Sequence, residues 1–190
     1  MRQETLHLEL NTDYAARIRE IAHEVGAVIE GDFVLASGLK SKRYFEGKKI
    51  TLWPEGAHLV GEAFLEMLAD TDIDAIGGLA TGAYPIVTAV SLTSERKGKP
   101  IPSFVVREVV KTHGTERRIE GHIKEGWRVA IVDDVITAGG STFKALNAAE
   151  AMQCQVVKVM AIVDRHEGGS DRIKKAGYDF SAIMSFKSTD

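Results

Sequence analysis

The sequence predicts an α/β protein with a central, mostly parallel sheet flanked by helices. From residue 74 onward, stretches typical of strands alternate with stretches typical of helices, as in chains built from β-α-β units. The strand-like stretches at 129–132 and 156–163 are almost wholly apolar. That composition is expected of strands covered by helices on both faces.

The N-terminal part is expected to form one helix and two short strands. Apolar residues recur at helical spacing within 13–25, which predicts a helix with one buried face. That face would carry Ile18, Ile21, Ala22 and Val25. The segment DFVLASG (32–38) is predicted as a strand and turn, and KKITLW (48–53) as a second strand.

The remaining elements alternate in order. Pro54 and Pro85 lie near the starts of two helical patterns, where proline is favoured because the first helical N–H groups have no partner within the helix. The expected helices are 55–70, 84–98, 140–152 and 170–177. The expected strands are 73–79, 101–108, 127–134, 156–165 and 180–186. The segment 109–126 is polar and has no clear period.

Bulk composition indicates an ordinary globular chain. Its 190 residues predict one domain, 1–190, and 44% hydrophobic residues are enough for a core. The net charge of −3 argues against nucleic acid or an anionic membrane as a partner. The single cysteine, Cys154, is expected to be a small buried side chain. Without an apolar leader or a run near the roughly 18 residues of a membrane helix, a soluble, cytoplasmic protein is expected.

The segment VAIVDDVITAGGST (129–142) is predicted to hold a phosphate at a helix N-terminus. An apolar strand leads through a turn at 137–141 into the next helix. Unpaired N–H groups and the helix dipole favour an anion there. The glycines allow close approach, and the hydroxyls of Thr137, Ser141 and Thr142 add donors.

Two adjacent carboxylates, Asp133 and Asp134, end that strand. Carboxylates repel phosphates but accept hydrogen bonds from hydroxyl groups or hold a cation, so a ribose 5-phosphate would suit both halves of the segment. A plain strand–turn–helix explains the hydroxyls but not the acids. A Walker B strand is also similar, but GGLATGAYP (77–85) lacks the lysine of a P-loop, and GxGxxG is absent.

The same segment resembles the phosphoribosyl pyrophosphate (PRPP) binding motif of the type I phosphoribosyltransferases. Four other stretches resemble parts of the orotate phosphoribosyltransferases. They are FVLASGLKSKRYFEG (33–47), the base-binding hood; GGLATGAYP, the pyrophosphate loop; VVREVVKTHGTERRIEG (105–121), the mobile catalytic loop; and IVDRHEGG (162–169), whose arginine contacts orotate. The resemblance covers about residues 13–185.

The resemblance implies a type I phosphoribosyltransferase fold with a small hood contributed by about residues 1–50 and the C-terminal segment. It implies transfer of the phosphoribosyl group of PRPP to orotate, giving orotidine 5′-monophosphate and pyrophosphate, with Mg²⁺ held mainly by PRPP. It also implies a homodimer in which loop 107–121 acts in trans. The six histidines show no paired ligand spacing, so no protein metal site is expected.

The resemblance also implies the site residues. Catalytic roles would fall to Lys111, His113, Asp133 and Asp134. The residues expected to bind PRPP are Thr81, Gly82, Arg107, Lys111, His113, Asp133, Asp134, Val135, Ile136, Thr137, Ala138, Gly139, Gly140 and Ser141. Those expected at orotate are Tyr44, Phe45, Thr137 and Arg165. Arg165 would pair with the orotate carboxylate or bind its carbonyls, and the two aromatic residues would cover the pyrimidine or pack the hood.

The chain departs from this family at three positions where lysine is common: Ala36, Gly82 and Glu108. Lys40 or Lys42 would be the replacement for the first. These departures leave open a phosphoribosyltransferase for another base, such as a purine. A PRPP-sensing regulator that binds nucleic acid is disfavoured, because it would need a basic face or an added helix-turn-helix.

Overall fold

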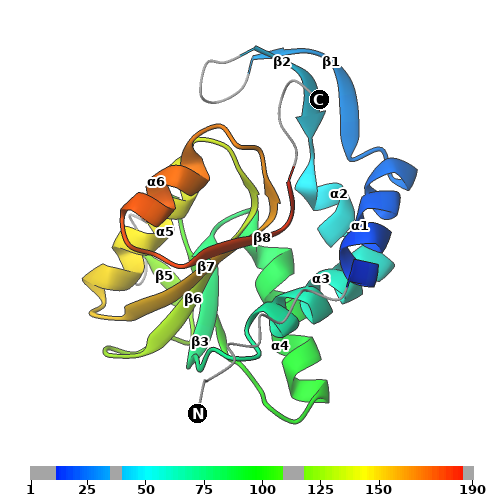
Figure 1. Ribbon diagram of the computed structural model, residues 1–190. Coiled ribbons are helices and arrows are strands. Elements are labelled where there is room, and N and C mark those ends of the chain that lie inside the picture. Colours follow the sequence, from blue (N-terminus) through cyan, green and yellow to red (C-terminus); the bar gives the residue numbers. More distant parts are fainter. Residues whose placement is uncertain (1–11, 35–39, 109–117, 186–190) are drawn as a thin grey trace, which may run out of the picture.

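The computed structural model describes residues 12–34, 40–108 and 118–185 (Figure 1). The helices are α1 (Thr12–Glu24), α2 (Gly47–Thr51), α3 (Pro54–Met67), α4 (Ala83–Arg96), α5 (Gly140–Ala151) and α6 (Gly169–Lys175). The strands are β1 (Val28–Val34), β2 (Lys40–Phe45), β3 (Ala75–Leu79), β4 (Ser103–Val106), β5 (Ile119–Gly121), β6 (Arg128–Ile136), β7 (Gln155–Asp164) and β8 (Phe180–Ser185).

The main sheet has the strand order β5-β4-β3-β6-β7-β8. Its neighbouring strands run parallel except for β5, which is antiparallel to β4. The predicted mostly parallel sheet is therefore confirmed. The chain order reverses between β3 and β6, which lie side by side. In open α/β sheets, ligands bind at the carboxyl ends of strands next to such a reversal.

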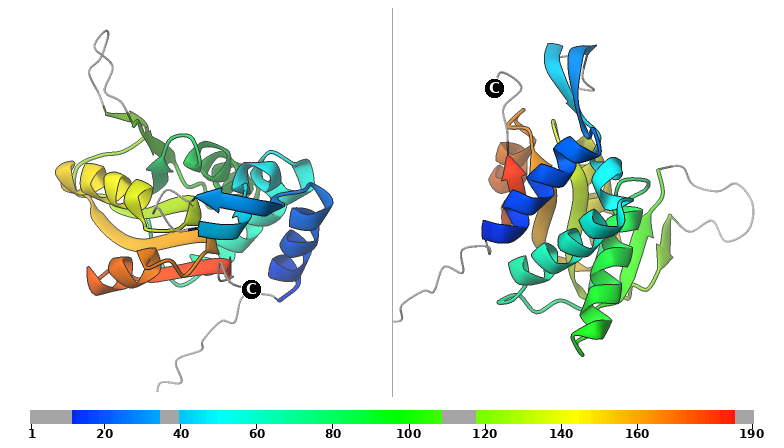
Figure 2. Two further views of the ribbon diagram at one scale, coloured as in Figure 1. Left: turned by 90° about the horizontal axis from the view of Figure 1, so that it is seen from above. Right: turned by 90° about the vertical axis from the view of Figure 1, so that its right-hand side faces the viewer.

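Helices cover both faces of this sheet (Figure 2). On one face, Ile76 of β3 and Val132 of β6 belong to a buried cluster with Phe64 of α3. On the other face, Ile131 of β6 belongs to a second cluster with Leu146 of α5. Successive strand residues thus enter opposite cores, which confirms the interpretation of the apolar runs.

Helix α1 confirms the first predicted element. Ile18 and Ile21 are fully buried, and Ala22 is almost fully buried. Val25 is partly buried against the core cluster that contains Ile18 and Ala22. The helix packs on α3 and α2. This packing places the segment that follows α1 above the main sheet, where the hood begins (Figure 1).

The hood contains a two-stranded antiparallel ribbon, β1 and β2, separate from the main sheet. The predicted strand at 48–53 is wrong, because Gly47–Thr51 forms helix α2. Ile50 is buried, but Leu52, just after the helix, is 72% exposed, so these two apolar residues do not share one buried face of a strand. The actual strand β2 has the sequence KSKRYF, whose polar residues suit a solvent-exposed ribbon and hide its strand character.

The observed strands differ from the predicted ones in two smaller ways. The first hood strand, β1, spans Val28–Val34, so it begins before the predicted 32–38. The short strand β5 lies in the segment interpreted as aperiodic, and the sequence did not reveal it because three residues are too few to show a period.

Cys154 is buried as predicted, 6% exposed, and burial raises the pKa of its thiol. None of the helices in the described ranges is long and apolar enough to cross a bilayer.

Candidate functional site

The acidic pair lies at the carboxyl end of β6, which continues to Ile136, past the predicted end of the strand. Asp133 is 5% exposed. Its Oδ2 accepts hydrogen bonds from the hydroxyls of Ser141 (2.5 Å) and Thr142 (2.9 Å), and its Oδ1 accepts one from the N–H of Asp134 (3.0 Å). Two hydroxyls predicted to meet a phosphate thus donate to a carboxylate, because a buried carboxylate requires donors.

Burial controls the protonation of Asp133. Removal from water, followed by the negative charge of Asp134, raises the pKa of Asp133 to about 7. The hydrogen bonds from Ser141 and Thr142 oppose this rise. Asp133 is therefore poised to change its charge near neutral pH.

Asp134 lies between two close backbone approaches. A Cβ carbon on Gly82 would stand 2.7 Å from its Oδ1, and one on Gly47 would stand 2.8 Å from its Cβ. Its Oδ2 is 3.6 Å from Nζ of Lys48. The side chain is 13% exposed. Asp134 therefore lies at the rim of the sheet, meaning the edge formed by the carboxyl ends of its strands. Gly82 and Gly47 pack against it, and the ammonium group of Lys48 lies near its Oδ2.

The glycine-rich segment after β3 meets the acidic pair: a Cβ carbon on Gly82 would stand 2.7 Å from Oδ1 of Asp134 and 3.3 Å from Oδ1 of Asp133. Thr81 is exposed and follows a cis peptide bond after Ala80. Gly82 is the N-cap of α4, where no side chain caps the helix. The backbone N–H groups at this end of α4 are thus uncapped, as an anion site requires.

The turn after β6 has the features of a phosphate cradle. Gly139 has φ of +79° and is the N-cap of α5, without a side-chain cap. Nothing lies within 4 Å of the position a Cβ on Gly140 would take. From below, Gly169 N–H donates to Thr137 O (2.9 Å), and Arg172 donates to Ala138 O (2.6 Å). These two hydrogen bonds tie the turn to α6, and no side chain caps the N-terminus of α5.

A pocket of about 340 Å³ separates the hood from this rim. It brings together the acid Asp134 and all four residues predicted at orotate. Its lining consists of Val34, Tyr44, Phe45, Glu46, Gly47, Lys48, Asp134, Val135, Thr137 and Arg165. The hood and the rim therefore enclose one space between the predicted base and ribose positions.

The two hood aromatics differ in their exposure. Phe45 is 4% exposed and belongs to the hydrophobic core. Tyr44 is 43% exposed and packs against Phe33, with ring centroids 5.6 Å apart. Phe45 therefore anchors the hood, and Tyr44 presents its ring at the mouth of the pocket.

Arg165 follows β7 and is 2% exposed. It donates to the carbonyl oxygen of Arg43 in β2 (3.2 Å) and lies 3.5 Å from a carboxylate oxygen of Glu167, which is itself 4% exposed. Burial lowers the pKa of Arg165. The side chain joins the hood to the sheet, with one face on the pocket.

Of the predicted loop residues, Arg107 lies 2.7 Å from Oε1 of Glu120, and Tyr84 donates to Oε2 of that carboxylate (3.1 Å). These bonds connect the base of the loop to the start of α4. Glu108 pairs with Lys144 of α5 at 2.8 Å, which lowers the pKa of Glu108.

Lys111 and His113 lie outside the described residues, as does Ala36. The side chain of Lys40 is likewise outside the described part of the chain. Lys42 is exposed and pairs with Asp32 in the ribbon, and it is not among the residues that line the pocket. The sequence-based proposal that Lys42 replaces the hood lysine has no support from this position.

Sequence reasoning missed Lys48 and its neighbours Glu46 and Gly47, all of which line the pocket. The signal was the lysine pair at 48–49, which lay in a segment assigned to a strand. In a strand, adjacent side chains point to opposite faces. In helix α2, Lys48 faces the pocket, and Lys49 donates to the carbonyl oxygen of Gly26 (3.0 Å).

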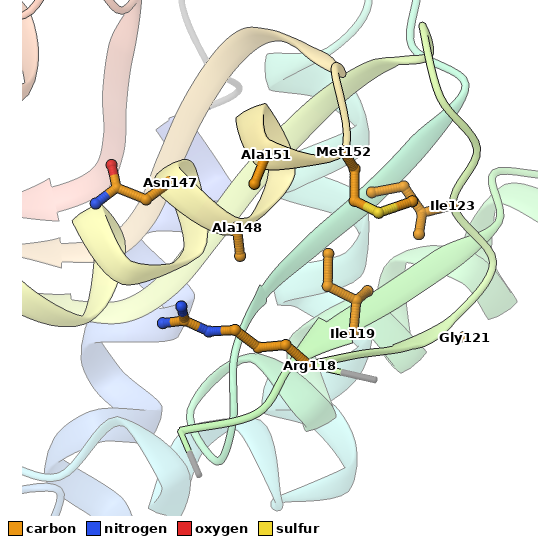
Figure 3. A pocket seen from close by; sticks show the side chains of 8 residues that line it. All are labelled: Arg118, Ile119, Gly121, Ile123, Asn147, Ala148, Ala151 and Met152. Carbon is orange, nitrogen blue, oxygen red and sulfur yellow. The ribbon is translucent and has the colours of Figure 1, made fainter. Parts of the chain in front are cut away.

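A second hollow, of about 490 Å³, lies between β5 and α5 (Figure 3). Its floor is apolar, with Ile119, Ile123 and Met152, and Arg118 and Asn147 lie toward one end. None of the predicted site residues lines it. The titratable pair and the open helix N-termini all lie at the other site.

Comparisons with known proteins agree with the geometry. A family model described as the phosphoribosyl transferase domain matches residues 46–185. The chain is 42% identical over 157 residues to the orotate phosphoribosyltransferase of Nostoc sp., covering 82% of this chain and 76% of that protein. It is 44% identical over 152 residues to that of Aquifex aeolicus, covering 80% and 83%. The Mycobacterium tuberculosis orotate phosphoribosyltransferase in complex with PRPP has a TM-score of 0.72 and 30% identity, covering 92% of this chain and 94% of that one.

Proposed function

Because this chain belongs to the orotate phosphoribosyltransferases, we propose that it transfers the phosphoribosyl group of PRPP to orotate in pyrimidine biosynthesis. The observation that carries the proposal is the pocket between the hood and the rim, which joins Tyr44 and Arg165 to Asp134. The products are orotidine 5′-monophosphate and pyrophosphate. No comparable feature favours transfer to a purine base or a role as a PRPP-sensing regulator.

The acid pair and the two uncapped helix starts suit the three parts of PRPP. The turn 137–141 would bind the 5-phosphate through backbone N–H groups and the hydroxyl of Thr137. Asp134, with Asp133 behind it, would accept hydrogen bonds from the ribose hydroxyls. Thr81 and Gly82 would present N–H groups to the pyrophosphate. Val135, Ile136, Ala138, Gly139 and Gly140 would shape this surface through their backbone.

The transfer forms the bond from N1 of orotate, which has lost its proton, to C1 of the ribose while the bond from C1 to the pyrophosphate oxygen breaks. Positive charge develops on the sugar. The carboxylates beside the ribose would stabilise that charge, and the pyrophosphate charge would be met by Arg107, Lys111 and His113. Exclusion of water by the hood would prevent hydrolysis of PRPP.

The acidic pair fits a Mg²⁺ ion held mainly by the substrate. Both oxygens of Asp133 accept hydrogen bonds from the chain, and Asp134 shares its outer oxygen with Lys48. Within the described residues, no three His, Cys, Asp or Glu side chains gather as a metal site. Such a donor set leaves most ligand oxygens to PRPP and water. When bound, the cation would neutralise charge on the pyrophosphate.

The assembly completes the proposal. The whole chain, 1–190, would act as one domain in the cytoplasm, paired as a homodimer in which loop 107–121 contributes Lys111 and His113 to the neighbouring site. Support comes from the two ends of this loop, which are fixed by Arg107 to Glu120 and Glu108 to Lys144. None of these four residues is among those that line the pocket.

A panel of bases tests the proposed function. The purified chain with PRPP and Mg²⁺ would be given orotate, uracil, adenine, guanine, hypoxanthine and xanthine, and release of pyrophosphate would be measured. We expect orotate to be used fastest, and Asp134→Asn to lower this activity strongly. Faster use of any purine would contradict the assignment.

A further inference from the structure

The pocket beneath the hood contains two cationic side chains, and they differ in how their charge is used. Arg165 is 2% exposed, donates to Arg43 O and lies 3.5 Å from the buried carboxylate of Glu167. Its position and much of its charge are therefore already committed within the protein. It is suited to donating hydrogen bonds from a fixed place.

Lys48 is the contrasting cation. Its side chain is 44% exposed, and its Nζ lies 3.6 Å from Oδ2 of Asp134, beyond the usual length of a hydrogen bond. The buried backbone of Gly47 packs directly on Asp134, so the first turn of α2 is fixed beside the acid. The flexible lysine stem then lets the ammonium move between Asp134 and a ligand.

The chemistry of orotate distinguishes these two positions. Its carboxylate is attached to C6, and C6 is bonded to N1, the atom that joins the ribose. In the product, the carboxylate therefore lies beside C1 of the sugar, while the carbonyl oxygen on C4 lies across the ring. A cation that recognises the carboxylate must stand next to the residues that hold the ribose.

We infer that Lys48 is a specificity-determining residue that binds the carboxylate of orotate from its place beside Asp134. This inference rests on the proposed function and deepens it. Arg165 then holds the carbonyl edge of the pyrimidine. The assignment also supplies a cation to a hood in which Ala36 stands where the family commonly has lysine.

Two nucleotides that differ only in the carboxylate isolate this contact. Calorimetric titration would compare orotidine 5′-monophosphate with uridine 5′-monophosphate on the wild type, Lys48→Met, Lys48→Gln and Lys48→Arg. We expect either neutral variant to lower the ratio of the two affinities by about 10- to 100-fold, because a charge-assisted hydrogen bond is lost. Affinity for uridine 5′-monophosphate should change by less than about twofold, and Lys48→Arg should keep most of the ratio.

Lys49→Met is the matched control, because Lys49 is the adjacent residue of the same helix and does not line the pocket. It should leave the ratio unchanged. A wild-type ratio in Lys48→Met and Lys48→Gln, or equal weakening of both nucleotides, would overturn the inference. A wild type that does not convert orotate would instead refute the proposed function, since the binding ratio is measured without turnover.

Discussion

Gly82 lies against the carboxylate of Asp134 so closely that a Cβ carbon on residue 82 would stand 2.7 Å from Oδ1. The pyrophosphate loop and the ribose-binding acids are therefore in direct contact. Lysine is common in the family at the position of Gly82, and a lysine here would place a Cβ carbon at this same point. Its introduction here would require Asp134 to move.

Gly82→Ala tests this contact. The backbone at residue 82 has φ of −61° and ψ of −38°, which alanine adopts without strain. The effect should therefore come from displacement of Asp134, lowering kcat/KM for PRPP by about 100-fold while the melting temperature changes little. Steady-state kinetics and thermal melts provide the comparison, and unchanged kinetics would show that Asp134 moves aside without consequence.

Replacement of the acids should separate binding from folding. Asp134→Asn should lose about 1.5–3 kcal/mol of transition-state stabilisation, as expected for hydrogen bonds to a charged group, and remain folded because its side chain faces the pocket. The double variant Asp133→Asn, Asp134→Asn should have no measurable transfer. Near wild-type kcat/KM in a folded double variant would remove the ribose-binding role from the pair.

The buried carboxyl of Asp133 should make stability depend on pH. Its pKa rises from 3.8 to about 7 on folding, so between these values the folded chain retains a proton that the unfolded chain has released. This residue therefore lowers the free energy of unfolding as pH rises through that interval. The amide of Asp133→Asn does not titrate, so this contribution to the pH dependence of stability is absent in the variant.

Urea unfolding at about pH 5 and about pH 8 measures this effect. The free energy of unfolding of the wild type, relative to Asp133→Asn, should be higher at the lower pH. The variant controls for the titrating groups that do not contact residue 133, because the two proteins share those groups. A difference between the two proteins that is the same at both pH values would be inconsistent with a raised pKa.

The main sheet was predictable because its strands are buried on both faces. Runs such as 129–132 are nearly continuous in apolar residues, and a buried parallel strand requires such a run. The position of Asp133 and Asp134 at the sheet rim follows from the same reasoning, since polar residues directly after a buried strand lie at its carboxyl end.

The hood was predicted less well, for a physical reason. A two-stranded ribbon has little core of its own, so β2 needs no apolar pattern, and Ile50 resembled a strand residue although it is buried from helix α2. The partners of Ser141 and Thr142 were also out of reach. The same hydroxyls satisfy a phosphate or a buried carboxylate, and only the folded geometry distinguishes the two.

Lys111 should act late in the reaction. If its loop contacts strengthen mainly as pyrophosphate leaves, Lys111→Ala will lower kcat far more than it raises KM for PRPP. When Lys111→Ala and Asp134→Asn chains are mixed, the hybrid dimers should regain activity at one of their two sites. After equal mixing, half of the dimers are hybrids with one intact site, so recovery should approach about a quarter of wild-type activity. No recovery after verified subunit exchange would indicate a loop that acts within its own subunit.

Arg165 needs a two-step substitution, because it pairs with a buried acid. Arg165→Leu alone removes the guanidinium that lies 3.5 Å from the carboxylate of Glu167, which should lower stability. The double variant Arg165→Leu, Glu167→Gln removes that charge and should recover part of the loss in urea unfolding. Kinetic comparison in the double variant then reports on the ligand rather than on the fold.

In that double variant, KM for orotate should rise by about tenfold or more while KM for PRPP stays nearly constant. If Arg165 holds the carbonyl edge and Lys48 the carboxylate, loss of Arg165 will weaken orotidine and uridine 5′-monophosphate alike, whereas Lys48→Met weakens only the former. Selective loss of orotidine 5′-monophosphate binding in the arginine variant would instead assign the carboxylate to Arg165. An unchanged KM for orotate would remove Arg165 from base recognition and leave it the structural role of joining β2 to the end of β7.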